Sequence, residues 1–409
     1  MSDANSVPIV KRSARELALL LAALSMLGPF SIDTYMPSFP EIGQSFGATS
    51  MQLQFTISAF LAPFATMALF HGAIADSFGR RPVILINLLI FIAASAGCAL
   101  AQVYHQLLWC RVMQGFAGGA GMIVGRAMIR DRFAGAEAQR MMSSVTMIFG
   151  LAPAIAPIIG GWLQAAFGWR SVFVFLVLYA ASLLVVCSWR LPETLPRREL
   201  QPFAVRPLLA NYGRVLGSLR FGLLSSAIAF NFAAFFLYIA GAPTVIYQWL
   251  GLNEREFAWL FVPGISGIVI GAFVSGRVAG RLAAWQTLRL GYGVMFAAVV
   301  CNVGYHFTAP PALPWTVLCV MLYTGGMAIA TPTLTLQALD LFPHNRGMAA
   351  SLQAFQQGIF TAITAVAIVP HVADSAPAMA LTAATLLACG ALCGHGFLRR
   401  PRNKEKQHA

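Results

Sequence analysis

Long apolar runs recur along the whole chain, and they predict helices that cross a membrane. Each run holds about 20 residues, which is enough for a helix to span about 30 Å of hydrocarbon. A β-barrel would instead show short segments of alternating hydrophobicity. The sequence therefore predicts an all-α polytopic membrane protein with twelve transmembrane helices, at residues 17–38, 52–75, 82–101, 107–129, 141–165, 171–190, 221–246, 257–276, 288–308, 314–338, 347–369 and 377–397.

One long polar stretch, residues 191–220, interrupts this pattern and divides the chain. It predicts an N-terminal six-helix bundle (1–190), a cytoplasmic linker (191–220) and a C-terminal six-helix bundle with a basic tail (221–409). Within the linker, PLLANYGRVL is either a short interfacial helix or a simple tether. The loops GAIADSFGRRP and SGRVAGRLAAW occupy corresponding places in the two halves. Such repetition is typical of transporters that hold substrate between two pseudo-symmetric halves.

The net charge of +13 reflects membrane topology rather than nucleic-acid binding. With the N-terminus inside, nearly all of the 27 basic residues fall in cytoplasmic segments, as the positive-inside rule requires. Both termini are then cytoplasmic, and the basic surface suits anionic lipid headgroups. The first apolar run is too long for a signal peptide and has no clear cleavage site, so we interpret it as an uncleaved helix.

No metal, cofactor or catalytic constellation is expected from this sequence. The seven cysteines lie in or beside apolar runs, and packing is the favoured interpretation even for the closely spaced Cys389 and Cys393. The histidines are scattered, and no glycine-rich phosphate loop is present. We therefore expect a protein that is not an enzyme.

The loop GAIADSFGRRP predicts a gate on the cytoplasmic side. It resembles the loop motif of the major facilitator superfamily, approximately G-x-x-x-D-x-x-G-R-R/K. Its glycines permit close helix approach and a tight turn, its aspartate can face a helix N-terminus, plausibly that of the eleventh helix, and its arginine can reach an acid ending the fourth helix. The alternative is a basic loop that sets topology only. The predicted gate residues are Gly72, Asp76, Gly79, Arg80, Arg81, Arg130 and Asp131.

Two further segments resemble motifs of the same superfamily. RVMQGFAGGA is similar to the fourth-helix motif and contains Arg111, an intramembrane arginine that marks a candidate functional site. GLAPAIAPIIGGW resembles the fifth-helix motif of the antiporter branches, although Ala156 replaces its usual glycine; ordinary packing of small residues is the alternative. The residues of this antiporter-like motif are Gly150, Pro153, Pro157, Gly160 and Gly161.

Within the superfamily the chain resembles the bicyclomycin-resistance (Bcr/CflA) group. The segments that carry the resemblance are SIDTYMPSFP, ADSFGRRP, RAMIRD, LPET and LDLFPHNRGMAASL. This resemblance implies proton-coupled export of varied small molecules across the bacterial inner membrane. The alternatives are export of a single metabolite or siderophore and, less favoured, proton-coupled nutrient import; a membrane enzyme or sensor ranks far below. Two halves can form the transport path without a partner, so we expect a monomer.

Asp33 is the acid predicted to lie well inside a helix, at a depth similar to that of Arg111. Burial disfavours the ionised carboxylate, whereas a nearby guanidinium favours it. We therefore predict that Asp33 carries the coupling proton and that Arg111 tunes it; the alternative is a static ion pair. Aromatic and polar residues on the helices expected to face the centre are the candidate substrate-cavity lining: Phe30, Tyr35, Gln54, Phe60, Gln114, Asn231, Phe235, Tyr238 and Gln337.

Overall fold

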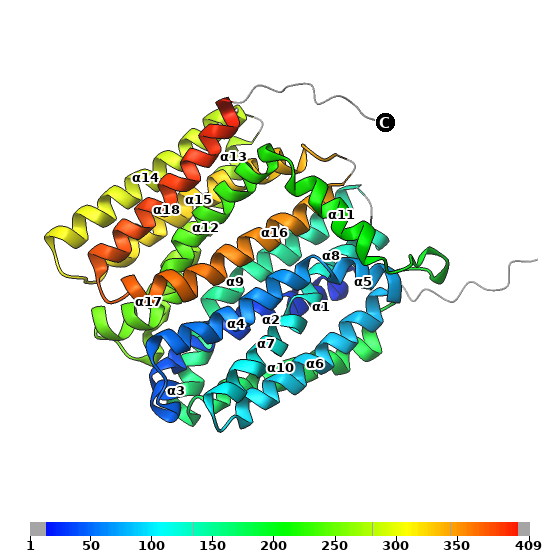
Figure 1. The fold of residues 1–409 in the computed structure, drawn as a ribbon, viewed down its shortest axis with the longest axis horizontal. Coiled ribbons are helices and arrows are strands. Elements are labelled where there is room, and N and C mark those ends of the chain that lie inside the picture. The colour runs from blue at the N-terminus through cyan, green and yellow to red at the C-terminus, as the bar shows by residue number, and fades with distance from the viewer. Residues whose placement is uncertain (1–13, 134, 280, 344, 400–409) are drawn as a thin grey trace, which may run out of the picture.

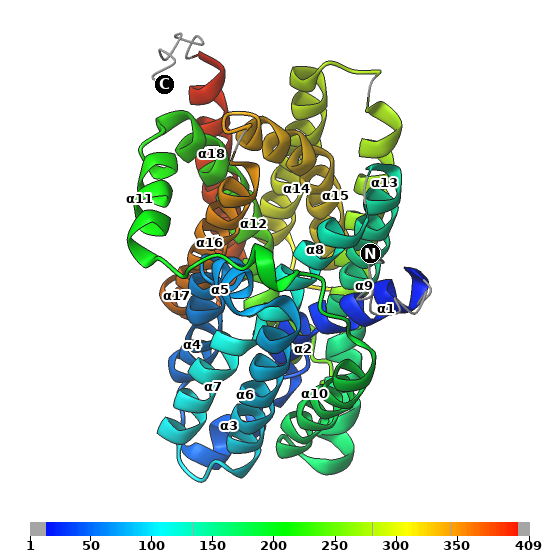
Figure 2. The ribbon, with the colours of Figure 1, turned by 90° about the vertical axis from the view of Figure 1, so that its right-hand side faces the viewer.

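The computed structural model describes residues 14–133, 135–279, 281–343 and 345–399, and within them all regular structure is helical. The helices form two bundles that lie side by side, joined by a linker that crosses one end of the molecule (Figures 1 and 2). We call that end the linker end and the opposite end the distal end. The chain termini and the basic tail, whose cytoplasmic location was predicted, lie outside the described residues.

The N-terminal bundle holds the first six predicted spans. Several spans are broken into two or more helices, which are separated by a few residues or by a single 3-10 turn. The elements are α1 (Ala14–Ser25), α2 (Leu27–Asp33), η1 (Met36–Ser38), α3 (Phe39–Phe46), α4 (Ser50–Ala68), α5 (His71–Phe78), α6 (Arg80–Leu100), α7 (Tyr104–Gly118), α8 (Ala120–Arg132), α9 (Gly135–Phe167) and α10 (Arg170–Arg190).

The linker and the C-terminal bundle follow. The linker contains η2 (Arg197–Glu199) and α11 (Val205–Leu216), so the predicted short helix forms. The bundle consists of α12 (Leu219–Ala240), η3 (Thr244–Trp249), η4 (Glu254–Glu256), α13 (Ala258–Val278), α14 (Ala284–Thr308), α15 (Trp315–Leu339), α16 (Arg346–Ile363), η5 (Thr364–Ile368), α17 (Val369–Val372) and α18 (Ala376–Arg399).

The described helices include eleven that are long and apolar enough to span a membrane, or twelve when α4 and α5 are counted as one bent span. These two helices meet at an angle of 52°. The first span differs from the prediction because it continues from Glu16 to Phe46 through several breaks. The predicted twelve-helix fold is confirmed. The breaks within the spans are the main feature that was not predicted.

Two pairs of helices contribute most to the contact between the bundles: α4 with α16, and α9 with α13. Small residues let these helices approach closely, as is usual for packing inside membranes. A Cβ on Gly358 of α16 would stand 2.5 Å from that of Ala65 on α4.

Candidate functional site

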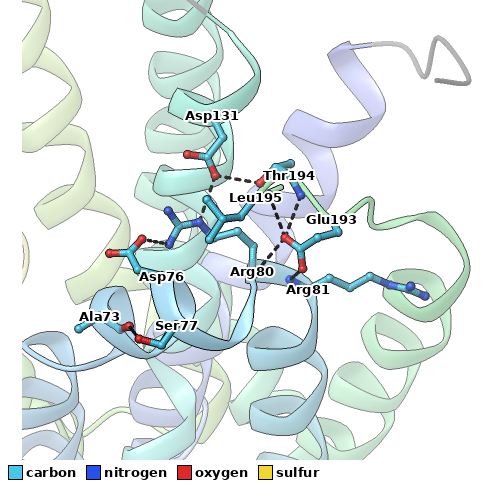
Figure 3. Close-up of polar contacts among 9 residues, drawn as sticks. All are labelled: Ala73, Asp76, Ser77, Arg80, Arg81, Asp131, Glu193, Thr194 and Leu195. Carbon is cyan, nitrogen blue, oxygen red and sulfur yellow. Dashed lines mark hydrogen bonds and ion pairs between the residues drawn. The ribbon is translucent and has the colours of Figure 1, made fainter. Parts of the chain in front are cut away.

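Arg80 is the centre of the predicted gate at the linker end (Figure 3). Its guanidinium lies 2.6 Å from the Asp76 carboxylate and 3.0 Å from that of Asp131. The Arg80 side chain is nearly buried, whereas Asp76 is substantially exposed. The predicted contact between Arg80 and the end of the fourth helix is thus present. Asp76 pairs with Arg80, its own neighbour one turn away.

Glu193, at the start of the linker, is a member of this cluster that the sequence analysis missed. Its carboxylate accepts hydrogen bonds from the backbone N–H groups of Arg80 and Arg81, at 3.0 and 3.1 Å, and from those of Thr194 and Leu195. The Thr194 hydroxyl donates to Asp131 at 2.9 Å. Glu193 therefore caps the first turn of α6, where an anion is favoured by free N–H groups and by the helix dipole. Figure 3 shows how this joins the linker to the gate.

Gly79 makes this arrangement possible. Its φ of 95° lies in a region that side chains disfavour, and a Cβ there would stand 2.7 Å from a Glu193 carboxylate oxygen. The predicted tight turn is present at Gly79. At Gly72 a Cβ would meet nothing within 4 Å, so no close approach is present there in this structure.

Replacing Glu193 with glutamine should lower the thermal stability of the purified protein. Both oxygens of the Glu193 carboxylate accept hydrogen bonds from backbone N–H groups. In either orientation a glutamine amide would therefore place its NH2 group against an N–H donor. Loss of a helix cap costs about 0.5–2 kcal/mol, so we expect a lower melting temperature, measured by intrinsic fluorescence. Glu199→Gln, at an exposed position of the same linker, is the control and should change little. Equal melting temperatures for Glu193→Gln and the unmodified chain would refute the capping role.

The remaining predicted gate residues have different surroundings. Arg81 donates from its guanidinium to the Ser188 carbonyl at 2.5 Å, which ties α6 to the end of α10. Arg130 reaches toward the other bundle, where a Cβ on Gly347 of α16 would stand 3.7 Å from its guanidinium. Arg130 is therefore a gate residue that lies beside the start of the eleventh span.

Arg111 is fully buried on α7 and is held by neutral groups. One guanidinium nitrogen donates to the Ser31 carbonyl at 2.9 Å and to the Gln114 amide oxygen at 2.8 Å. The faces of Tyr35 and Phe60 each lie 4.8 Å from the guanidinium carbon. A second guanidinium nitrogen has no hydrogen-bond partner among the described residues. These contacts fix the position of a charge inside the N-terminal bundle.

Asp33 is buried but does not pair with Arg111, so the alternative of a static ion pair is wrong for this structure. Asp33 forms no ion pair with any described residue, because the carbonyl, amide and ring contacts already hold the guanidinium. It is the last residue of α2, where the helix gives way to a turn and a 3-10 segment. The acid thus lies at a break in the first span, beside α9, which α2 contacts.

The two adjacent glycines of the antiporter-like motif lie on α9, where one meets its own bundle and the other meets the C-terminal bundle. A Cβ on Gly160 would stand 2.1 Å from the Thr34 carbonyl oxygen, just after Asp33. A Cβ on Gly161 would stand 1.9 Å from the Glu254 carbonyl oxygen in the C-terminal bundle. Pro153 borders a small cavity, and Pro157 is buried. Gly150 has no neighbour within 4 Å of its Cβ position, so close packing does not require a glycine there.

Hydrogen bonds join the bundles in their distal halves. Gln54 donates to the Ala240 carbonyl at 2.8 Å, and Ser58 donates to the Ala362 carbonyl at 2.7 Å. The Tyr247 hydroxyl donates to the Pro37 carbonyl at 2.7 Å. Together with Gly161, these contacts hold the distal ends of the two bundles together. Ser58 and Tyr247 are further residues that the sequence analysis missed.

The predicted cavity residues do not gather in one place. Phe30 packs on Phe175 and Tyr179, within the N-terminal bundle. Tyr35, Phe60 and Gln114 surround Arg111, and Gln54 lies between the bundles. In the C-terminal bundle, Asn231 donates to the Tyr292 hydroxyl, and the Gln337 amide oxygen is buried without a described partner. Phe235 and Tyr238 line two small adjoining cavities, one of which also borders Pro153.

The bundle pair, its buried acid and arginine, and the charged cluster at one end define a multi-pass membrane transporter. The model of the Major Facilitator Superfamily matches residues 20–365, and the chain belongs to this family. It is 32% identical over 341 residues to the uncharacterized MFS-type transporter YdgK of Bacillus subtilis, covering 82% of this chain and 84% of that one. It is 27% identical over 349 residues to a bicyclomycin resistance protein homolog of Haemophilus influenzae, with the same two coverages.

A solved structure has the same fold. The human organic anion transporter MFSD10 superposes with a TM-score of 0.69 at 19% identity, covering 95% of this chain and 99% of that one. Transporters of this family are not enzymes, as the sequence analysis expected.

Proposed function

We propose that this chain exports drug-like small molecules across the bacterial inner membrane in exchange for protons, by alternating access. The observation that carries the proposal is Asp33, a buried carboxyl with no ion pair among the described residues, placed at a helix break beside α9. An ionised carboxylate without a partner is costly inside a membrane, and such residues mark ion and proton pathways. Arg111 stays charged and so biases Asp33 without carrying the proton.

The gate and the distal contacts support alternating access. Access to a site between the bundles must close at one end before it opens at the other. In this structure the distal ends are held together by Gln54, Ser58 and Tyr247. The positive-inside rule assigns the distal end to the outside, so this state has its outer side closed. At the linker end Arg130 lies against Gly347 of the other bundle, and in this cycle it forms the inner contact together with the cluster around Arg80.

The resistance protein of Haemophilus influenzae supports the cargo class, because its name refers to resistance to an antibiotic. Aromatic walls with few polar groups, as around Phe235 and Tyr238, suit drug-sized ligands. We therefore propose small, largely apolar molecules as substrates and a monomer as the working unit.

A drug-susceptibility panel tests the function. We expect the gene to raise the tolerated concentration of some compounds in an efflux-deficient bacterial host. Inverted vesicles with an acidic interior should accumulate the same compounds, since outward export becomes inward uptake in that orientation. Dissipating the pH gradient should stop the uptake. A cargo that the gene causes to accumulate in intact cells would instead identify an importer.

A further inference from the structure

The linker helix α11 lies across the linker end, against both bundles. Figure 1 shows it running crosswise to the spans, and Figure 2 shows it along the flank of the C-terminal bundle. It contacts α12 and α16 of the C-terminal bundle. Its Tyr212 hydroxyl donates to the Leu69 carbonyl of the N-terminal bundle at 2.9 Å. Burial raises the pKa of Tyr212, so this hydroxyl remains a donor at neutral pH.

These contacts place α11 beside the ends of the membrane spans. Leu69 lies in the break between α4 and α5, and α5, which is about 12 Å long, continues toward the linker end at an angle of 52° to α4. The first residue of the next span, Leu219, follows α11 almost directly. The helix is therefore held beside the ends of the spans and does not project beyond them.

The face of α11 that the protein leaves uncovered has an apolar edge. Tyr212 and Val215 are buried against the bundles. Val205, Leu209 and Leu216 remain 42, 50 and 57% exposed, and their spacing of four and seven residues places them on one side of the helix. A membrane protein exposes such an edge where lipid covers it.

The exposed edge of α11 next to these apolar residues carries only positive charge. Arg206 and Arg214 are both exposed, and the helix contains no acidic residue. No aspartate or glutamate occurs between Glu199 and Glu254. An apolar edge next to a basic edge is the pattern of helices that lie in the membrane interface.

We propose that α11 is a membrane-surface helix that binds anionic phospholipid. Val205, Leu209 and Leu216 enter the acyl boundary, while Arg206 and Arg214 hold the phosphate-bearing headgroups. Arginines in this position are attracted by the negative surface potential of the cytoplasmic leaflet. The occupant is thus the bilayer that surrounds the protein, whatever its cargo or coupling ion.

Photocrosslinking tests the apolar contact. A benzoylphenylalanine at position 209, in the full chain reconstituted into phosphatidylglycerol–phosphatidylcholine vesicles, should yield lipid adducts detected by mass spectrometry. The control places the same group at Ala210, which is exposed beside the arginines, and should yield far fewer. Adducts of position 209 with a second copy of the chain, in place of lipid, would overturn the proposal.

Native mass spectrometry tests the charged contact. The double variant Arg206→Ala, Arg214→Ala should bind phosphatidylglycerol about thirtyfold more weakly than the unmodified protein, with no change for phosphatidylcholine. Arg277→Ala, Arg281→Ala removes the same charge from the same end of the molecule, away from α11, and should have little effect. Equal losses from the two double variants would show general attraction to basic residues and would refute a site on α11.

Discussion

Replacement of Asp33 by asparagine is expected to abolish transport driven by a pH gradient while leaving the fold intact. Asparagine keeps the size and polarity of the side chain but cannot release a proton. Asp33 forms no ion pair with a described residue, so the change leaves no opposite charge unpaired. Removing one partner of a buried ion pair would instead lower the free energy of unfolding by about 3–5 kcal/mol. We therefore expect Asp33→Asn to lose transport while its melting temperature stays close to that of the unmodified chain.

Two measurements on Asp33→Asn check the expectation. Uptake into inverted vesicles with an imposed pH gradient should fall to the level of vesicles without the protein. Proton release on adding drug to purified protein should disappear, although an uncharged drug can still bind. Asp374→Asn, at an exposed distal position, is the matched control and should behave as the unmodified chain. Wild-type uptake and proton release in Asp33→Asn would place the proton site elsewhere.

The number of spans could be predicted from sequence because an apolar run of sufficient length is a local signal. The breaks within the spans could not. The first span passes from α2 through a turn and the 3-10 segment η1 to α3, between Asp33 and Phe39. The acid therefore appeared to lie within a helix, although it lies at the end of one. A hydropathy pattern records composition along the chain and does not record where packing interrupts the helix.

The gate shows which contacts a motif can reveal. Arg80 and Asp131 were predicted as partners because each ends a helix on the same side of the membrane, and they lie 3.0 Å apart. Glu193 was missed because its backbone partners lie 112 and 113 positions away. The sequence did hold one signal. Glu193 is an acid that directly follows a span, and a helix that begins at the same membrane face attracts an anion to its free N–H groups.

The cavity residues were harder to predict because the rotation of each helix decides where its side chains point. Phe30 and Tyr35 are aromatic residues of the first span, yet both are buried within the N-terminal bundle. In spans with apolar residues on every side, periodicity distinguishes poorly between a face toward lipid, a bundle interior and a central path. Tertiary packing supplies that choice.

Alanine at Gly161 is expected to stop transport by preventing closure of the distal end. Its Cβ would stand 1.9 Å from the Glu254 carbonyl oxygen of the other bundle. Overpacking of this kind costs about 1–3 kcal/mol. The penalty applies only to the state in which the distal ends meet, so it shifts the equilibrium between states by up to about a hundredfold. The N-terminal bundle itself should remain stable.

Alanine at Gly160 should have a different effect, although the two glycines are adjacent. Its Cβ would meet the Thr34 carbonyl within the N-terminal bundle at 2.1 Å. That contact does not join the two bundles, so the cost falls on folding rather than on closure. Gly160→Ala should therefore lower the melting temperature, whereas Gly161→Ala should largely keep it.

Hydrogen exchange separates these outcomes. In Gly161→Ala, amides of residues 244–256 should exchange faster than in the unmodified protein, because the distal contact opens, and vesicle uptake should fall in parallel. Gly150→Ala on the same helix is the control, since a Cβ there meets nothing within 4 Å. If Gly161→Ala showed unchanged exchange and unchanged uptake, closure of the distal end would not depend on this glycine. The antiporter-like motif would then serve packing alone.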